Sequence, residues 1–320
     1  MSQRDRRIGG QGLLTAGVVG LVTTLLAWSA APLGWPFELT RHFTPHLTVA
    51  ALVMLAAAAL ARSPMRAAVA GLAALVFGWA WATAPFKAAT PHAGPPALTV
   101  AVFNARFDAD ALARFAVWAE AQPVDILMLA EAQGPSPATL ETLFAAWPHS
   151  AMSDAEISAG GFRWSTRSAV FSRWPVETTA LAREASAQFS RPVIQLDVSH
   201  PHGAIQVSGL HPFPPLLPRA GVEQAAMFDA VAEQVPADER FIVMGDLNTT
   251  VWSPHYARLP GQRAGDPRLA STFPAALPVG GIAIDHILLG DAFEVVRTQV
   301  GPDLGSDHRP VLAAIALSEN

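Results

Sequence analysis

The sequence predicts an α/β protein, a mixed-sheet sandwich preceded by three transmembrane helices, and three observations lead to this prediction. The chain is 51% hydrophobic and 15% charged, with a mean hydropathy of +0.29, which is too apolar for one ordinary soluble domain. The excess of apolar residues lies in the first 90 residues. The rest of the chain has many short strand-like runs and few helical patterns, which does not fit the regular alternation of a Rossmann or TIM-barrel fold.

Three apolar segments near the N-terminus each have the length of a membrane span. No charged residue occurs from Ile8 to Phe37, from His42 to Ala61 or from Ala67 to Phe86, and about 20 apolar residues are enough to cross a bilayer. The segments lack the amphipathic spacing of helices that pack in a soluble core. We therefore expect a membrane anchor over residues 1–83, with transmembrane helices at about 11–33, 46–61 and 67–83.

Basic residues set the expected orientation of the anchor. Those expected on the cytoplasmic side precede the first segment or lie between the second and third: Arg4, Arg6, Arg7, Arg62 and Arg66. An odd number of crossings then puts the chain after Lys87 outside the cytoplasm. The first segment could instead be a cleaved signal peptide, which would leave the same topology. The Pro- and Ala-rich residues 84–96 are the expected linker to a domain over residues 97–320.

Composition narrows the chemistry of this domain. The first 90 residues carry a net charge of +5 and residues 91–320 one of −10, giving the −5 of the whole chain. An acidic domain without a basic run does not favour tight, non-specific binding of nucleic acid, although it does not exclude a nuclease site. The chain has no cysteine, so disulfides and thiolate metal sites are excluded, and His, Asp, Glu and Asn remain as metal ligands.

Apolar runs of strand length follow one another along the domain. Eight are expected as strands, at residues 98–103, 126–130, 169–172, 193–198, 204–210, 241–244, 282–289 and 311–315. Three patterns are expected as helices, at residues 110–121, 136–146 and 219–234. Asp108 or Asp110 is placed to cap the first of these helices. The sequence has no internal repeat and no glycine fingerprint of a P-loop or a dinucleotide-binding loop.

Polar residues directly follow several of these strands and indicate chemistry. Near the C-terminus they form the motifs Gly245-Asp246-Leu247-Asn248, Ile284-Asp285-His286 and Ser306-Asp307-His308-Arg309-Pro310. Earlier strands end in Asn104, Glu131 and His211, each of which, taken singly, has a structural explanation as a turn, loop or solvated residue. A buried strand that ends in a carboxylate needs a partner, and a hard divalent cation is the natural one.

The order of these motifs resembles the endonuclease/exonuclease/phosphatase superfamily over roughly residues 97–318. The resemblance implies a DNase I-like, four-layer sandwich of two mixed β-sheets flanked by helices. It also implies metal-dependent hydrolysis of a phosphoester without naming the substrate, because the family includes nucleases, sphingomyelinases and inositol polyphosphate phosphatases. The fusion to three spans resembles bacterial membrane-anchored members, which implies a bacterial inner membrane with the catalytic domain extracytoplasmic.

The resemblance implies a ligand set for Mg²⁺ or Mn²⁺. Glu131 is the principal carboxylate ligand, and Asp307 and Asn104 complete the protein's share of the shell. Such a set suits Mg²⁺, which prefers oxygen ligands and keeps several waters. Arg106 stands where some nuclease members carry a further carboxylate, so whether one or two metals bind stays open.

The resemblance also implies the catalytic roles. Asp246 orients and deprotonates the attacking water, and Asn248 donates a hydrogen bond to the phosphate or the nucleophile. Residues i and i+2 of an extended chain point the same way and can share a pocket, although an Asx-turn at the strand end is the alternative. His308 stabilises the scissile phosphate or protonates the leaving oxygen, and Asp285 accepts its other ring N–H. His211 resembles the second histidine of the DNase I and sphingomyelinase branches.

Three further residues near these motifs have open roles. Arg191 and Arg309 could contact phosphate oxygens, which suit the guanidinium fork, but Arg309 could equally form a surface ion pair. His286 should point away from Asp285 because neighbouring residues of a strand alternate in direction, and it is expected to be structural.

The function expected from the sequence is therefore that of a membrane-anchored, divalent-metal-dependent phosphoesterase. Its substrate would be a phosphodiester or phosphomonoester outside the cytoplasm, in a lipid headgroup, another envelope component or a nucleic acid. The alternative is a catalytically silent, membrane-tethered binding protein with the same fold. Apart from the membrane and the substrate, the sequence indicates no obligate protein partner.

Overall fold

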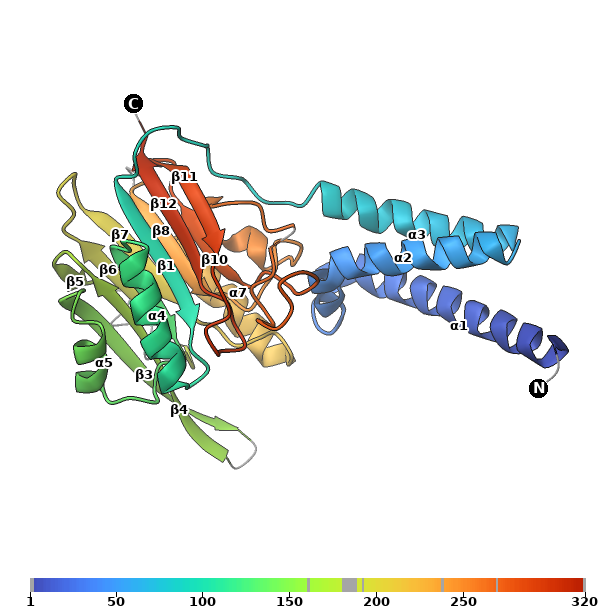
Figure 1. Ribbon diagram of the computed structural model, residues 1–320, viewed down its shortest axis with the longest axis horizontal. Coiled ribbons are helices and arrows are strands. Elements are labelled where there is room, and N and C mark those ends of the chain that lie inside the picture. Colours follow the sequence, from blue (N-terminus) through green and yellow to red (C-terminus); the bar gives the residue numbers. More distant parts are fainter. Residues whose placement is uncertain are drawn as a thin grey trace.

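A helical anchor projects from one side of a β-sandwich, with the start of α1 at its far end (Figure 1). The computed structural model describes residues 3–159, 162–179, 189–191, 193–236, 239–268 and 270–318. The elements of the anchor are α1 (Gln3–Ser29), η1 (Ala31–Leu33), η2 (Phe37–Phe43), α2 (Thr44–Leu60) and α3 (Pro64–Ala82). Three helical stretches, Gly10–Ser29, Phe37–Leu60 and Pro64–Ala82, are long and apolar enough to cross a membrane.

The anchor helices pack through a narrow apolar seam. Trp28 and Phe77 meet edge to face with their ring centroids 5.7 Å apart, and Trp28 Nε1 donates a hydrogen bond to Thr44 Oγ1 at 3.0 Å. Outside the seam, large apolar side chains are exposed, including Leu60 at 87% and Trp79 at 73%. An exposed apolar surface of this kind is typical of helices that face lipid, so the helices suggest membrane anchoring.

The sandwich contains two mixed sheets of six strands each. The first has the order β11 (Phe293–Val300), β12 (Val311–Leu317), β1 (Leu98–Asn104), β2 (Ile126–Ala130), β4 (Phe162–Ser172) and β3 (His149–Ala159). The second has the order β5 (Val176–Thr178), β6 (Ile194–Val198), β7 (Ile205–Leu210), β8 (Phe241–Asp246), β10 (Asp285–Leu289) and β9 (Gln262–Arg263). Each sheet has a parallel pair at its centre, β1 with β2 and β7 with β8.

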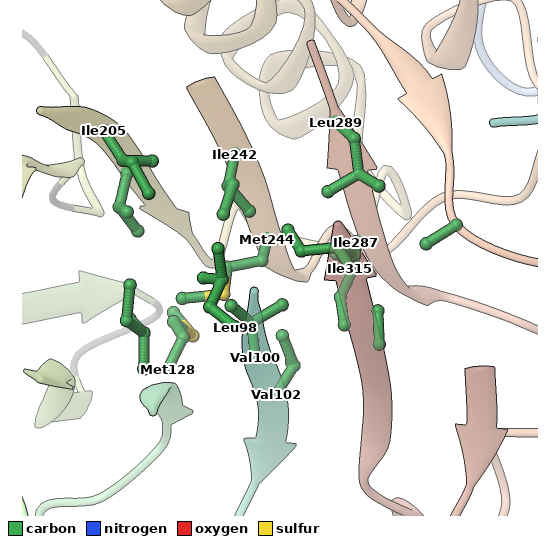
Figure 2. Packing of buried hydrophobic residues seen from close by; sticks show 14 of the residues in the cluster. Leu98, Val100, Val102, Met128, Ile205, Ile242, Met244, Ile287, Leu289 and Ile315 are labelled. Carbon is green, nitrogen blue, oxygen red and sulfur yellow. The ribbon is translucent and has the colours of Figure 1, made fainter. Parts of the chain in front are cut away.

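The main apolar core lies between the two sheets. Val100 and Val102 of β1 lie in one cluster with Met244 of β8 and Ile287 of β10 (Figure 2). Because successive residues of a strand point to opposite faces, Phe103 instead joins a second cluster on the outer face of the first sheet. The central strands are therefore buried on both faces, which explains why they are continuous apolar runs in the sequence.

Helices cover the outer faces of both sheets and complete the four layers: α4 (Ala109–Ala121), α5 (Pro137–Leu143) and α7 (Pro218–Ala232). Phe115 of α4 stacks on Phe103 of β1 with the ring centroids 4.8 Å apart. Met227 and Phe228 of α7 pack with residues of β8 in a third cluster. The prediction of two mixed sheets flanked by helices and preceded by three long apolar helices is confirmed.

The strand prediction was incomplete at the margins of the sheets. All eight expected strands are present, and the structure adds β3, β5, β9 and β11. β3 and β11 are edge strands of the first sheet, and their mixed polar sequences contain no long apolar run that would mark them. The strand expected from residue 282 begins only at Asp285. Asp108 caps α4 by accepting a hydrogen bond from Ala111 N at 2.9 Å.

The segment between anchor and sandwich, residues 84–96, lies along the sheet edges. Ala88 forms a bridge with Arg263 of β9, and Pro91 forms one with Val295 of β11. Lys87 Nζ lies 2.9 Å from Asp291 Oδ1 in an ion pair. These contacts hold the segment against both sheets, so that its path is set by the sandwich.

Candidate active site

Four polar side chains converge at one edge of the sandwich. Asn104 ends β1, and Glu131 directly follows the parallel neighbour β2. In the second sheet His211 directly follows β7, and Asp246 ends its parallel neighbour β8. Parallel neighbours end at the same edge of a sheet, and the two sheets pack face to face. The sequence therefore brings the four residues together through its two parallel strand pairs.

A hydrogen bond joins the two sheets at this edge. Asn104 Nδ2 donates to Asp246 Oδ2 at 2.9 Å, and Asn248 N donates to Asp246 Oδ1 at 3.0 Å. Asp246 is only 1% exposed, so these two donors replace much of the hydration that its carboxylate loses on burial. The orientation of this carboxylate is therefore fixed.

Asp285 and His308 form a buried pair beside Asp246. Asp285 lies opposite Asp246 in the antiparallel ladder of β8 and β10. Its Oδ2 atom lies 2.9 Å from His308 Nδ1, and because a carboxylate only accepts, Nδ1 carries the proton of this hydrogen bond. The other ring nitrogen, Nε2, lies 3.7 Å from Asp246 Oδ2. This separation exceeds a direct hydrogen bond, so Nε2 and the Asp246 carboxylate face a shared point with room for a reacting group.

Burial and charge shift the pKa values of Asp246 and His308 in useful directions. Burial raises the pKa of Asp246. The positive charge of His308 lowers this pKa, and the negative charge of Asp285 raises it. Burial alone would lower the pKa of His308, but the charges of Asp285 and Asp246 and the hydrogen bond to Asp285 outweigh it and raise this pKa to about 10. The imidazole therefore holds its proton at neutral pH and can donate it.

His211 and Arg191 line the same site from the second sheet. His211 Nε2 lies 3.6 Å from both Glu131 Oε1 and Asp246 Oδ2, and Arg191 Nη1 contacts both ring nitrogens. Burial first, and then the charge of Arg191, lower the pKa of His211 well below its usual value. Arg191 Nη2 lies 3.9 Å from Glu131 Oε1. His211 is therefore a neutral ring held beside a buried guanidinium group.

Glu131 and Asp307 offer carboxylate oxygens that fit a hard cation, and Asn104 offers an amide oxygen that also accepts a hydrogen bond from Arg106 N at 3.0 Å. Burial raises the pKa of Glu131, and the negative charge of Asp307 acts on the same carboxyl group, which shows that the two acids are close enough to repel. The side chains of Glu131 and Asp307 are 17% and 32% exposed, so the waters that Mg²⁺ keeps have access. A cation bound between these two acids would reduce the repulsion between their negative charges.

A second candidate metal group is buried deeper. Asp246, Asp285 and His308 each offer a donor atom, and these atoms lie within 4.8 Å of one another. All three side chains are nearly inaccessible, and His308 Nδ1 and Asp285 Oδ2 already share a 2.9 Å hydrogen bond. A magnesium ion that retains waters suits the open Glu131 edge better, whereas the buried group is better arranged for proton transfer.

The backbone around the site adopts sparsely populated conformations. Arg106, Glu131 and Asn248 have φ angles of +50°, +53° and +48°. Such conformations cost about 1–3 kcal/mol each and gather at functional sites. At Gly245 a Cβ atom would overlap the carbonyl oxygen of Leu210 on the parallel neighbour. This glycine therefore lets β7 and β8 approach closely where His211 and Asp246 emerge.

The other predicted residues lie as follows. Asn248 Nδ2 donates to Pro212 O at 3.0 Å, which ties the Asp246 loop to the His211 loop. Arg309 Nε donates to Ala275 O at 2.8 Å; among the described residues no contact joins its guanidinium group to Asp246 or Glu131. His286 is buried, with Arg263 Nε donating to its Nδ1 at 2.9 Å and its Nε2 bonded to Thr249 O at 2.8 Å. Its role is structural, as its strand position indicates.

Sequence reasoning missed two residues that hold the site together. Ser306 Oγ donates to Asn104 O at 2.7 Å and accepts from His308 N at 3.1 Å, so it joins the first and last motifs. Its place in the Ser-Asp-His motif was a signal for this role. Gln224 of α7 donates through Nε2 to Leu247 O at 3.1 Å. An isolated glutamine on a helix gave no comparable signal.

A family model described as the Endonuclease/Exonuclease/phosphatase family matches residues 101–308. The chain belongs to this family. The match includes every residue of the site from Asn104 to His308. Membership of the Endonuclease/Exonuclease/phosphatase family makes the protein a phosphoesterase, a hydrolase, and the buried Asp246, Asp285 and His308 are consistent with a metal site in it.

Several solved structures share this fold. An endonuclease/exonuclease/phosphatase from Beutenbergia cavernae aligns with a TM-score of 0.53 and 22% identity, over 69% of this chain and 72% of that one. A mannosyl-6-phosphatase from Bacteroides thetaiotaomicron aligns with a TM-score of 0.53 and 16% identity, over 69% of this chain and 100% of that one. A 3′ phosphatase from Neisseria bound to a product DNA hairpin aligns with a TM-score of 0.50 and 17% identity, over the same shares. No curated protein matches the chain in sequence.

Proposed function

We propose that the protein is a membrane-tethered, Mg²⁺- or Mn²⁺-dependent phosphoesterase of a bacterial inner membrane, with its catalytic domain outside the cytoplasm. The observation that carries this proposal is the juxtaposition of Asp246 with the Asp285–His308 pair and with Glu131 at one edge of the sandwich. A buried base, a protonated acid and an oxygen-rich edge are the groups that phosphoester hydrolysis needs.

Glu131, Asn104 and Asp307 are the residues that would hold the metal ion. When bound there, the ion would offset the charge that develops on the phosphoryl oxygens. Arg106 Nε lies 3.5 Å from Asp307 Oδ2, and Arg191 Nη2 lies 3.9 Å from Glu131 Oε1. These guanidinium groups balance part of the negative charge of the two acids and are near enough to meet phosphate oxygens.

Asp246 is the group that would orient and deprotonate the attacking water. Its raised pKa brings a carboxylate closer to the basicity that a general base needs. His308 keeps its proton through Asp285 and would donate it to a phosphate oxygen or to the leaving oxygen. His211 adds a neutral ring beside the Asp246 carboxylate. Asn248 fixes the Asp246 loop through its backbone N–H and its side chain.

The substrate that the surroundings favour is a phosphoester of a lipid or another envelope component. Two loops run from the site to the anchor: residues 211–217 begin at His211 and contact Trp35, and residues 272–282 pass His308 and contact His46. These loops carry exposed apolar side chains at Leu216 (62%), Leu217 (64%), Leu277 (47%) and Val279 (82%). Such side chains beside membrane spans suit insertion at a bilayer surface. The acidic domain is less suited to a nucleic acid.

The test uses the full chain in lipid nanodiscs with Mg²⁺, Mn²⁺ or EDTA. The substrates are bis-p-nitrophenyl phosphate, supercoiled DNA and phospholipid vesicles, with Asp246→Ala as the inactive control. We expect EDTA-sensitive turnover that Asp246→Ala abolishes, with the lipid preferred over DNA. A fully active Asp246→Ala protein would contradict the proposed chemistry, and DNA as the better substrate would contradict the lipid assignment. No turnover on any of these esters together with no metal binding would favour the silent binding protein.

A second variant tests the assignment of a lipid as the substrate. Replacing Leu216 and Leu217 together by Ser removes apolar side chains that have no catalytic contact. We expect the apparent KM for vesicles to rise at least about fivefold, because apolar burial at the interface contributes to binding, while turnover of bis-p-nitrophenyl phosphate stays unchanged. An equal loss on both substrates would show that the pair supports the fold instead.

A further inference from the structure

A buried acid of the anchor reaches into the catalytic domain. Glu38 lies in η2, at the start of the second apolar stretch Phe37–Leu60, and is only 1% exposed. Its Oε2 atom lies 2.8 Å from Nε2 of His255, a residue of the loop that follows β8. Removing a carboxylate from water is costly unless a charged or hydrogen-bonding partner meets it. The anchor and the catalytic domain therefore share this buried pair.

The pair continues to a glutamine of α7. His255 Nδ1 lies 2.8 Å from Gln224 Oε1. Gln224 Nε2 faces three carbonyl oxygens, those of Phe213 (3.3 Å), Leu247 (3.1 Å) and Asn248 (3.3 Å). Only an NH₂ group can satisfy carbonyl oxygens, which fixes the amide orientation and leaves Oε1 to accept from His255 Nδ1. The contact between His255 Nε2 and Glu38 Oε2 is then a second hydrogen bond, with a proton separate from the one on His255 Nδ1.

Gln224 thereby joins the two loops that carry the active site. Leu247 and Asn248 follow Asp246 directly, and Phe213 lies two residues after His211. Gln224 is completely buried, so loss of its orientation would leave these carbonyl oxygens without a donor in a place that water does not reach. Its amide is held at both ends, at Nε2 by the carbonyl oxygens and at Oε1 by His255 Nδ1, and His255 is held in turn by Glu38.

Two further contacts from the same anchor segment reach the same loops. His42 Nδ1 accepts a hydrogen bond from Thr250 N at 3.2 Å, two residues beyond Asn248. Trp35 Nε1 donates to Leu216 O at 3.0 Å in the loop that begins at His211. Residues 35–42 thus contact both catalytic loops. From α3, Ala80 O accepts a hydrogen bond from Trp252 Nε1 in the loop after Asp246 at 3.1 Å, whereas Trp81 Nε1 donates to Arg268 O at 3.3 Å, outside both loops.

We propose that Glu38 is a positioning residue: through His255 and Gln224 it holds the loop after Asp246 in its active geometry, so that the anchor is a structural part of the active site. The kinetic test of this inference rests on the proposed function. Hydrogen exchange in the loop after Asp246 provides a test that does not. Displacement of catalytic groups by a fraction of an ångström to one ångström lowers turnover by roughly 10- to 100-fold without removing any reacting group.

The experiment compares Glu38→Ala and Gln224→Met with Trp81→Phe, all as full chains in nanodiscs. Trp81→Phe is the matched control, because it removes an anchor-to-domain hydrogen bond that does not lead to a catalytic loop. We expect Glu38→Ala and Gln224→Met to speed hydrogen exchange at the amides of residues 247–251 and to lower kcat on bis-p-nitrophenyl phosphate roughly 10-fold or more, with KM within about twofold. Trp81→Phe should change neither quantity.

Wild-type exchange at residues 247–251 in both variants would overturn the proposal, and so would an equal effect of Trp81→Phe. Unchanged exchange in β1 and β12 shows that the variants are folded. If Glu38→Ala is not folded, Glu38→Gln takes its place, because it keeps the volume and removes the charge. Its effect should be smaller and in the same direction. If the wild-type protein does not turn over the ester, the proposed function fails, while the exchange experiment still decides the positioning role.

Discussion

At the scale of single residues, the site shows which roles a sequence can reveal. Asn104 and Asp246 end apolar strands, and Glu131 and His211 directly follow two others, so their position marked them. Gln224, His255 and Glu38 occupy a helix face, a loop and an apolar segment, and their partners come from distant parts of the chain. Only the folded arrangement makes these three residues neighbours, and no local pattern predicts them.

The Asp285–His308 pair yields a prediction at this scale. Asp285→Asn keeps the size and an acceptor for His308 Nδ1 but removes the negative charge that keeps the imidazole protonated. We expect kcat on bis-p-nitrophenyl phosphate to fall about 100-fold, within the range of lost acid catalysis. The matched control is Asp266→Asn, which removes the same charge from a surface ion pair with Arg268. Equal activity of the two variants would contradict the assignment of Asp285.

The buried His286 predicts a pH dependence of stability. Burial, and then the charge of Arg263, lower the pKa of His286 well below 6.5 in the folded state. Below about pH 6.5 the unfolded chain therefore binds a proton that the folded chain does not, and stability falls as the pH falls. Between pH 7 and 5.5 we expect this residue to account for a loss of about 1 kcal/mol. The free energy of unfolding should decrease less over this range in His286→Gln than in the wild type; equal decreases would contradict the assignment.

At the scale of elements, the sequence predicted the central strands of both sheets and missed the four edge strands β3, β5, β9 and β11. β1, β2 and β8 are continuous apolar runs because core lies on each side of them. β3 and β11 are edge strands with polar residues along them, and two-residue β9 offers no pattern at all. None of the predicted catalytic or metal-binding residues lies on β3, β5, β9 or β11, so the missed elements did not obscure the chemistry.

The close approach of β7 and β8 yields a second stability prediction. Gly245→Ala puts a Cβ atom into the carbonyl oxygen of Leu210, so the parallel pair must separate. We expect a loss of at least about 2 kcal/mol in the free energy of unfolding, as for other overpacked positions. Gly280→Ala is the control, because Gly280 also has a positive φ of +84° but no atom within 4 Å of the added Cβ. Equal losses would show that backbone strain alone acts at Gly245.

At the scale of the whole molecule, anchor and sandwich form a connected structure. Residues 84–96 lie along both sheets, and η2 reaches the catalytic loops. The sequence predicted the separate parts because length and hydropathy are local properties. It could not predict their contact, which depends on the pairing of Glu38 with His255 and on aromatic side chains such as Trp35 and Trp252 that bond across the boundary. The orientation of this assembly in the membrane is a prediction from the positions of the basic residues.

The absence of cysteine makes that orientation directly measurable. Ala146→Cys puts a single thiol on the exposed surface of the sandwich, and Ala61→Cys puts one in the exposed turn between α2 and α3. If the basic residues of that turn face the cytoplasm, a membrane-impermeant maleimide applied to intact spheroplasts should label Ala146→Cys, and label Ala61→Cys only after lysis. The cysteine-free wild-type chain is the blank. The reverse pattern would put the catalytic domain in the cytoplasm, where lipid headgroups of the inner leaflet rather than the outer one would be within its reach.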